Sequence, residues 1–391
     1  MSDAAGLRGA EAALLLAASR LTLTDEEAAR LRAAAAQVQD WDVLIAFARA
    51  HRVLPFVARH LADAATDVVP PPAMRELQRA RLEIAAHALD GACELARIQR
   101  AFASAGIRSL PYKGPQLSVL AYGDVSAREF VDLDFVVRPA EVARARDVLV
   151  SLGFRPREGM TRAQEGAIYG GQGHFPYVRA GASPLTVELH WRFAASRFPW
   201  NPPLGEILGR SAMVTIGGAS VPAPERTDHV LLLLLHGTRH RWEQLEWVVA
   251  VAELLRGGAV EGEVLLARAL PLDGVRAVLI GLEVSRRLLG APVPPVAAAL
   301  IERDAEVQAL TATVLGQMFP DVDRGDGIPE GQFYLRCLER SRNRARFVVQ
   351  SVLRPTPREW ELVRLAGWMT AIYVPLRLGR LLLRRSSLFK R

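Results

Sequence analysis

The chain has 391 residues, of which 50% are hydrophobic and 23% are charged. This balance is typical of folded globular proteins and argues against a disordered chain. A net charge of +7 favours anionic partners such as nucleotides, nucleic acid or acidic lipid, without choosing among them. Two cysteines, Cys93 and Cys337, are too few for a disulfide framework and indicate a reducing, cytoplasmic location. The apolar stretch near the start has no basic segment ahead of it, so we expect no signal peptide.

The hydrophobic pattern divides the chain into three regions. Apolar residues recur at helical spacing through most of the first hundred residues, which predicts an N-terminal helical region over 1–100. Shorter, alternating segments predict an α/β core over 101–225, and helical spacing then returns, which predicts a C-terminal helical domain over 226–391. The predicted fold class is therefore α+β, with a small mixed sheet and helices flanked by helical regions.

Within the core, segments with the period of a strand alternate with short helical segments. In chain order we predict a strand within 106–114, a helix over 115–123, a strand over 130–138, a helix over 140–154, two strands within 174–193, and a hairpin over 212–224 that turns at Gly217 and Gly218. A glycine-rich loop over 157–173 separates the second helix from the paired strands.

Lys113 stands out in this arginine-rich chain. Among 49 lysine and arginine residues, only Lys113 and Lys390 are lysines. Lys113 precedes Gly114 and Pro115 at a predicted strand-to-helix turn. A glycine there lets backbone N–H groups approach a phosphate, and the helix N-terminus adds partial positive charge. Lys113 is therefore a candidate phosphate contact, and the alternative is a lysine that extends to solvent from the end of a strand.

Two acids share one face of the predicted strand over 130–138. Side chains two residues apart point the same way, so Asp132 and Asp134 lie side by side. Val131, Leu133 and Phe135 occupy the other face and are predicted to pack in a core. Paired carboxylates suit Mg²⁺, which binds one or two carboxylates together with substrate phosphates. On spacing alone, two solvated acids at a strand end are the competing interpretation.

A third acid lies on another predicted strand. Glu188 and His190 share a face of the segment TVELHW, while Val187 and Leu189 share the opposite face. A glutamate and a histidine in the middle of an apolar strand are costly to bury unless they are paired. A shared metal ion would supply that pairing.

Taken together, these motifs resemble a known family. The segments KGPQLSVLAYGDVSAREFVDLDFVV, VELHW and HGTRHRWEQLEW are similar to the uncharacterised bacterial nucleotidyltransferase family, within the DNA polymerase β-type nucleotidyltransferase superfamily. That superfamily's pattern is a glycine loop, a short helix, a strand with Asp-x-Asp or Asp-x-Glu, and a third acid on a neighbouring strand. Weaker similarity extends over 40–61 and 354–382.

The resemblance implies a polymerase β-like nucleotidyltransferase core that uses an NTP as substrate and Mg²⁺ (or Mn²⁺) as cofactor. Asp132, Asp134 and Glu188 would be catalytic and would hold the metal. Glu188 would also help to deprotonate the acceptor hydroxyl.

The resemblance also implies a phosphate-binding set. Gly114 would let the loop approach the β- and γ-phosphates. The chain departs here from the superfamily's Gly-Ser or Gly-Gly, because Pro115 has no N–H and no serine hydroxyl follows the glycine. Lys113 would replace the missing contact as a point charge. Arg128 would reach a phosphate or brace the acid strand, and the alternative is one more surface arginine.

The segment 227–247 is predicted to be one helix with a histidine stripe. The stripe comprises His229, Leu233, His236, His240, Glu243 and Trp247. His236 and His240 have the spacing of a zinc-ligand pair, but the general-base glutamate of an HExxH motif is absent. The resemblance implies instead that this whole stripe faces the nucleotide cleft, with His236 and His240 binding the nucleotide and with Arg241 or Trp242 near the base or phosphate. A packed core pair is the alternative.

Two functions from different classes follow. The first is an enzyme that transfers an NMP from an NTP to a hydroxyl acceptor, on a small molecule or a protein, with release of pyrophosphate. The second is a catalytically degenerate module of the same fold that binds a nucleotide or a partner. We expect no nucleic-acid partner, because the chain shows no RNA-binding module or aromatic–basic interleaving. The basic C-terminal tail is also compatible with peripheral contact at an acidic membrane surface.

Overall fold

The computed structural model describes residues 9–157, 171–180, 185–319, 328–354 and 372–388, together with residues 359, 363 and 369. Most of the predicted glycine-rich loop and the turn between the paired strands lie outside these residues. So does much of the C-terminal segment that carries the weaker family resemblance.

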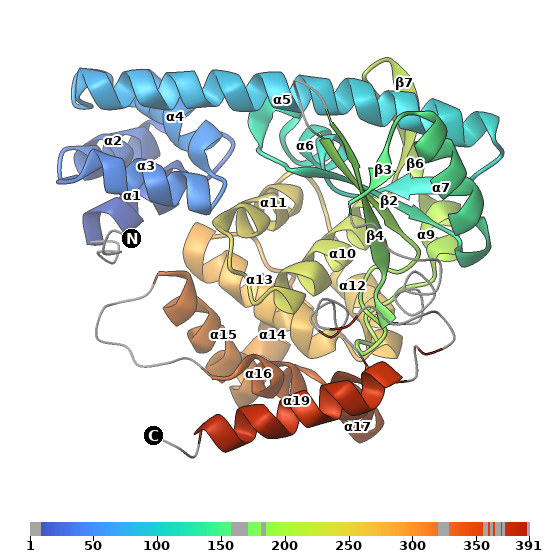
Figure 1. Ribbon diagram of the computed structural model, residues 1–391. Helices are drawn as coiled ribbons and strands as arrows, with labels where there is room; N and C mark the ends of the chain where they lie inside the picture. The colour runs from blue at the N-terminus through green and yellow to red at the C-terminus, as the bar shows by residue number, and fades with distance from the viewer. Residues whose placement is uncertain are drawn as a thin grey trace.

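The N-terminal region is helical, as predicted (Figure 1). Its helices are α1 (Gly9–Ala18), α2 (Asp25–Ala35), α3 (Trp41–Ala50), α4 (Leu54–Ala64) and α5 (Pro71–Ser104). Thr24 and Glu27 form a capping box that starts α2, because each side chain accepts a hydrogen bond from the other's backbone N–H. Helix α5 has 34 residues and begins with Pro71 at its first position. Its first part packs on α4, and its second part packs against the sheet and the hairpin.

The core contains a mixed five-stranded sheet in the order β1-β2-β5-β4-β3. Its strands are β1 (Ser109–Pro111), β2 (Asp132–Val137), β3 (Arg155–Pro156), β4 (His174–Arg179) and β5 (Leu185–His190). Strands β2 and β5 run parallel, and the other neighbouring pairs run antiparallel. The core helices are α6 (Pro115–Tyr122), α7 (Val142–Ser151) and α9 (Leu204–Arg210), and the hairpin is β6 (Ala212–Ile216) with β7 (Ala219–Ala223). All of these strands and helices except β3 and α9 fall within predicted segments.

One face of the sheet is apolar and packs against α5 and α7. Leu133 and Phe135 are fully buried there, and the Phe102 ring of α5 meets Phe135 edge-on with the ring centroids 5.5 Å apart. The prediction that Val131 joins this core is wrong. Val131 precedes the first residue of β2 and is 47% exposed, because the alternation of faces begins only at Asp132. The opposite face of the sheet carries the charged side chains of β2 and β5.

The turn between β1 and α6 depends on a glycine, as predicted. Gly114 has φ +65°, which side-chain-bearing residues rarely adopt, and its backbone lies close to the carbonyl oxygen of Asp132. Pro115 occupies the first position of α6, and Gly123 ends the helix with φ +72°. The short helix therefore places Lys113 and Gly114 directly beside the start of β2.

The C-terminal region is helical in its described part. Its helices are α10 (Arg226–Arg239), α11 (Leu245–Arg256), α12 (Gly262–Ala269), α13 (Val275–Leu289), α14 (Pro295–Arg303), α15 (Ala305–Met318), α16 (Glu330–Cys337), α17 (Ser341–Leu353) and α19 (Tyr373–Leu388). Every helix among the described residues is too short or too polar to cross a membrane.

The prediction of one continuous helix over 227–247 is wrong. Helix α10 ends at Arg239, and Arg241 and Trp242 both have positive φ, at 51° and 56°. The Trp242 ring is fully buried against Gly237 and Gly281, where even a Cβ atom would collide with it. Burial of this large ring stabilises the sharp turn between α10 and α11. Trp242 therefore belongs to the core and does not face a ligand.

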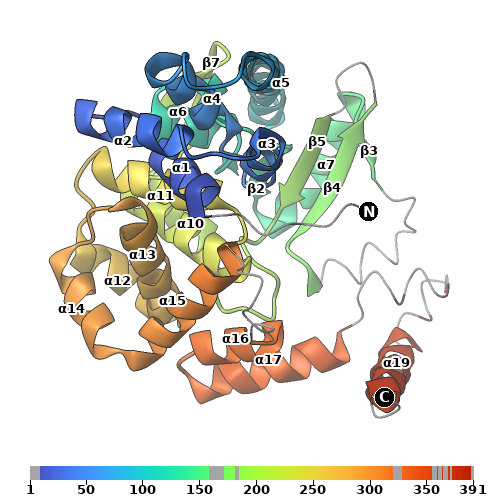
Figure 2. The same ribbon diagram turned by 90° about the vertical axis from the view of Figure 1, so that its left-hand side faces the viewer.

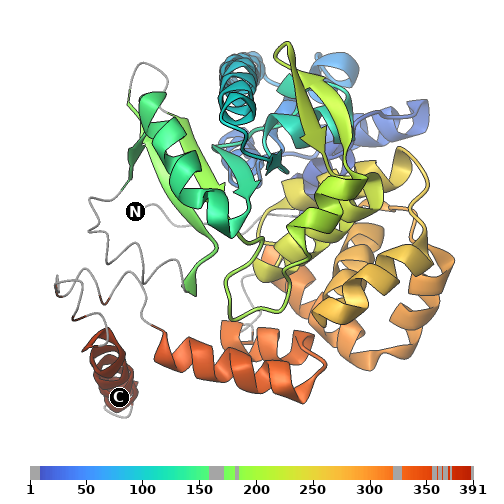
Figure 3. The ribbon, with the colours of Figure 1, turned by 90° about the vertical axis from the view of Figure 1, so that its right-hand side faces the viewer.

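The helical regions lie together beside the sheet. In Figure 2 the N-terminal helices α1–α4 lie on the same side of the sheet as α11 and α13, and α1 contacts α13. Figure 3 shows α7 covering one face of the sheet and the β6–β7 hairpin beside α5. The charged face of the sheet is thus turned toward α10 and the turn between α3 and α4.

Candidate functional site

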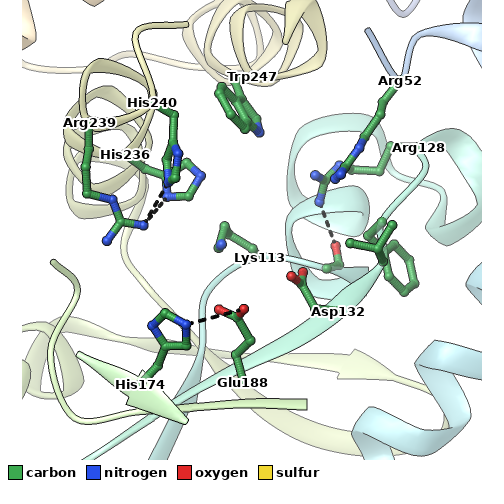
Figure 4. Close-up of a pocket in the computed structure, with 13 residues that line it drawn as sticks. Arg52, Lys113, Arg128, Asp132, His174, Glu188, His236, Arg239, His240 and Trp247 are labelled. Carbon is green, nitrogen blue, oxygen red and sulfur yellow. Dashed lines mark hydrogen bonds and ion pairs between the residues drawn. The ribbon is translucent and has the colours of Figure 1, made fainter. Parts of the chain in front are cut away.

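A cavity of about 210 Å³ opens on the charged face of the sheet, facing α10 (Figure 4). Its lining includes seven of the eight predicted site residues: Lys113, Gly114, Arg128, Asp132, Glu188, His236 and His240. The eighth, Asp134, is 1% exposed and does not line the cavity. Sequence segments more than a hundred residues apart therefore meet at one place.

Strand pairing brings the three predicted acids together. In the parallel pair β2–β5, Asp134 lies opposite Glu188, and Asp132 lies opposite Thr186. Asp132 and Glu188 reach the cavity, while Asp134 lies buried beside them. Because residues two apart share a face, the register places all three carboxylates on the same side of the sheet.

Lys113 and His190 neutralise the buried Asp134. The Nζ atom of Lys113 lies 3.0 Å from Oδ1 of Asp134, and Nε2 of His190 donates to the same oxygen at 2.9 Å. The Lys113 side chain is only 14% exposed, so it neither extends to solvent nor stands free beside the cavity. Burial alone would lower the pKa of Lys113, but the Asp134 carboxylate raises that pKa above its ordinary value and keeps the amine charged.

His190 joins two of the acids. Its Nε2 also lies 3.1 Å from Oε2 of Glu188, and its Nδ1 lies 3.4 Å from the carbonyl oxygen of Arg192. Carboxylate and carbonyl oxygens only accept hydrogen bonds, so both ring nitrogens act as donors. Burial alone would lower the pKa of His190, but the hydrogen bonds to Asp134 and Glu188 raise it above its ordinary value. His190 is therefore held as a cation between the two carboxylates.

The two acids that line the cavity differ in acidity. Burial and the neighbouring Asp134 carboxylate raise the pKa of Asp132 to about 6. Burial alone would also raise the pKa of Glu188, but the hydrogen bond and charge of His190 hold that pKa below its ordinary value. Two adjacent carboxylates with oppositely shifted pKa values are typical of functional sites.

Arg128 braces the site and does not point freely into it. Its Nε and one terminal nitrogen donate to the two oxygens of Glu246 on α11, at 2.6 and 2.9 Å. Its other terminal nitrogen donates to the carbonyl oxygen of Gly114 at 3.3 Å. Both side chains are almost completely buried, at 5% and 0% exposure. These contacts join Arg128 to the Gly114 turn and to α11, so it is not a free surface arginine.

The predicted histidine pair faces the cavity, and a neighbouring arginine holds it. One guanidinium nitrogen of Arg239 lies 3.3 Å from Nδ1 of His236 and 3.1 Å from Nε2 of His240. The Trp247 ring packs edge-on against His236, with the centroids 5.2 Å apart, and Trp247 also lines the cavity. His229 of the same predicted stripe lies elsewhere and contacts the carbonyl oxygen of Tyr112.

Six lining residues were not among the predicted site residues: Arg52, Phe130, Val131, His174, Arg239 and Trp247. Arg52 follows α3 and has φ 56°, a backbone conformation that no sequence pattern predicted. His174 stands opposite His190 in the antiparallel pair β4–β5, so a register drawn through the intervening turn would have found it. Arg239 was one arginine among many, and Trp247 was assigned to a stripe without a separate role.

The acids offer a place for a divalent cation. Oδ2 of Asp134 is buried and has no hydrogen-bond partner among the described residues, although its twin Oδ1 has two. An unpartnered buried carboxylate oxygen beside Asp132 and Glu188 fits a hard cation that prefers oxygen ligands. His174, Glu188 and His190 also bring possible ligand atoms within 4.8 Å of one another, so nitrogen ligands are available at the same edge.

A glycine turn, a short helix and acids on adjacent parallel strands thus surround one charged cavity. A family model described as "Uncharacterised nucleotidyltransferase" matches residues 37–290, well over half of the chain, so the chain belongs to this family. The match supports nucleotidyl transfer as the general reaction. Neither the curated proteins nor the solved structures include one that matches the chain.

Proposed function

We propose that the protein is a metal-dependent nucleotidyltransferase with a polymerase β-like core. It moves an NMP from an NTP to a hydroxyl acceptor, on a small molecule or a protein, and releases pyrophosphate. The observation that carries the proposal is the parallel pairing of β2 with β5, which sets Asp132 and Glu188 into one cavity beside Lys113 and the Gly114 turn.

The residues of the cavity suit the chemistry of a triphosphate. Asp132, Asp134 and Glu188 would hold Mg²⁺ or Mn²⁺, with Oδ2 of Asp134 as the acceptor that lacks a protein partner. When bound, such an ion neutralises phosphate charge and stabilises the attacking and leaving oxygens. Among the described residues, four cations from separate parts of the chain line the same cavity: Arg52, Lys113, Arg128 and Arg239. They complement an anionic substrate.

The reaction requires positioning more than covalent participation by the protein. The acceptor oxygen forms a bond to the α-phosphorus, and the bond from that phosphorus to the bridging oxygen of the β-phosphate breaks. Pyrophosphate leaves with that oxygen, and the hydroxyl proton passes to a cavity carboxylate, Asp132 or Glu188. Arg128 and Glu246 act indirectly by fixing the Gly114 turn.

Label transfer tests the proposal. The protein is incubated with each α-labelled NTP, Mg²⁺ or Mn²⁺ and candidate hydroxyl acceptors, and intact-protein mass spectrometry detects transfer to protein. Wild type is compared with Asp132→Asn and with Asp147→Asn, a matched control whose carboxylate is 69% exposed on α7. We expect transfer by wild type and the control and its loss in Asp132→Asn. Equal transfer by Asp132→Asn would reject the assignment.

A second candidate is a nucleotide- or partner-binding module of the same fold. It is favoured by Pro115, which removes an N–H from the phosphate loop, and by the pairing of Asp134 with Lys113 and His190. Calorimetry separates the two functions. Nucleotide binding that depends on Mg²⁺ and yields no pyrophosphate with any acceptor supports the binding module.

A further inference from the structure

The cations of the cavity differ in whether a carboxylate balances them. Two of the four form ion pairs, Lys113 with Asp134 and Arg128 with Glu246. The other two, Arg52 and Arg239 at the end of α10, form no ion pair with an acid in the described part of the chain. A guanidinium always carries its charge, so Arg239 faces the cavity without a counter-ion.

The surroundings of Arg239 fix its position with neutral groups. One terminal nitrogen donates to the carbonyl oxygen of Phe193 at 3.0 Å, and the other contacts His236 and His240. Its Nε is buried and has no partner among the described residues. Burial, with the nearby cations, lowers the pKa of His236 well below its ordinary value and the pKa of His240 to about 3. Both rings are therefore neutral near pH 7 and leave the charge of Arg239 unbalanced.

Arg239 also determines the tautomers of both histidines. Because a guanidinium can only donate, Nδ1 of His236 and Nε2 of His240 must accept. The protons of these neutral rings then sit on Nε2 of His236 and Nδ1 of His240. No described residue accepts either proton, and both rings line the cavity. The α10 side of the cavity thus presents one cation and two N–H donors, which is the chemistry of an anion site.

We propose that Arg239, with His236 and His240, binds the β- and γ-phosphates of the NTP and then the leaving pyrophosphate. This inference rests on the proposed function. The phosphate contact predicted from the sequence for Lys113 is placed at Arg239 instead, because Lys113 already neutralises Asp134.

The layout of the cavity favours phosphates over the nucleoside or the acceptor at this place. The α-phosphate must lie near Asp132 and Glu188, where bonds change. Figure 4 shows Lys113 between these carboxylates and the α10 side chains, so a triphosphate can extend past Lys113 toward Arg239. The opposite route, over the Gly114 turn, offers no serine hydroxyl and one N–H fewer.

Calorimetry with three probes tests the inference: Mg-pyrophosphate, Mg-ATP and AMP. The proteins are wild type, Arg239→Gln, Arg239→Lys and the control Arg30→Gln, which removes the same charge from a 64% exposed side chain on α2. We expect Arg239→Gln to weaken the binding of pyrophosphate and ATP about 10- to 100-fold, because a charge-assisted contact is lost. The binding of AMP should not change. The pyrophosphate affinity of Arg239→Lys should lie between those of wild type and Arg239→Gln. If Arg239→Gln does not fold, the affinity of Arg239→Lys tests the inference in its place.

The outcomes separate this inference from the proposed function. If Arg239→Gln weakens the binding of AMP and of pyrophosphate equally, Arg239 contacts the nucleoside and the inference is wrong. If both Arg239 variants bind pyrophosphate as tightly as wild type, Arg239 has no phosphate role and the inference is also wrong. A wild-type protein that binds none of the three probes would overturn it too. If pyrophosphate binding depends on Arg239 but no NMP is ever transferred, the proposed function fails while the inference stands.

Discussion

Arg128 and Glu246 form a buried, doubly hydrogen-bonded ion pair that joins the Gly114 turn to the C-terminal helices. Arg128 also donates to the carbonyl oxygen of Gly114, and the hydroxyl of Tyr122 lies 3.4 Å from the same Glu246 carboxylate. The pair therefore links the glycine turn, the short helix α6 and α11 in one network. The geometry of the loop depends on a residue more than a hundred positions away.

Removing one partner of this pair should be strongly destabilising. We expect Glu246→Gln to lower the free energy of unfolding by about 3–5 kcal/mol, because it leaves the Arg128 charge buried and unpaired. Urea unfolding followed by circular dichroism measures the change. The control Glu83→Gln removes a partner of Arg79 in an exposed pair and should cost no more than about 0.5 kcal/mol. A loss for Glu246→Gln no larger than that of the control would contradict the structural role given to this pair.

Lys113→Arg tests whether a compact charge is needed beside Asp134. The Lys113 ammonium lies within a crowded, almost fully buried group with His190. A guanidinium keeps the charge but is wider and planar, so it should displace His190 or move away from Asp134. We expect the rate of NMP transfer to fall at least about ten-fold, equivalent to about 1.4 kcal/mol in the barrier. Unchanged nucleotide affinity and transfer rate would show that only the charge of Lys113 matters.

Acid should weaken the fold through buried neutral histidines. Nε2 of His229 donates to the carbonyl oxygen of Tyr112 at 2.9 Å, and burial lowers the pKa of His229 from 6.5 to about 4. The unfolded chain binds this proton at a higher pH than the folded chain does. The stability that the neutral ring contributes is therefore complete above about pH 6.5 and is lost as the pH falls toward about 4. The full effect is about 3 kcal/mol for one such group.

His229→Gln isolates this contribution, because glutamine keeps an N–H donor and does not titrate in that range. We expect the difference in unfolding free energy between about pH 7.5 and about pH 4.5 to shrink by roughly 2 kcal/mol in the variant. The same pH difference in variant and wild type would mean that His229 is not neutral in the folded protein.

The two thiols should react very differently. Cys93 is exposed on α5, and Cys337 is fully buried at the end of α16, where burial raises the pKa of its thiol above the ordinary range. An aromatic disulfide reagent should therefore modify one thiol of the native protein quickly and the second only after denaturation. Cys93→Ala should abolish the fast phase. A fast phase that persists in Cys93→Ala would show that Cys337 is accessible.

Local sequence patterns predicted much of the core and of the site. The spacing of Asp132 and Asp134 correctly placed both carboxylates on one face of a strand, since the period of a strand needs only local geometry. Gly114, Pro115 and Gly123 likewise marked the ends of α6. The sequence did not show that β5 pairs parallel with β2, which is what brings Glu188 to Asp134.

The sequence-based predictions that failed depend on tertiary contacts. The turn between α10 and α11 exists because Trp242 fits against Gly237 and Gly281, which lie on different helices. Helical spacing through this segment could not reveal a turn stabilised by burial of a ring. Arg239 and Arg52 could not be singled out from composition in a chain with so many arginines. Their importance depends on which carboxylates the fold places near them.

In the proposed reaction, the α-phosphorus of an NTP is the reacting atom. Parallel reactions with α-labelled and γ-labelled NTP, in the presence of Mg²⁺ and an acceptor that wild type modifies, test it directly. We predict that the α-label moves to the acceptor while the γ-label appears only in pyrophosphate. A γ-label on the acceptor, with release of a nucleoside diphosphate, would contradict nucleotidyl transfer and indicate phosphoryl transfer instead.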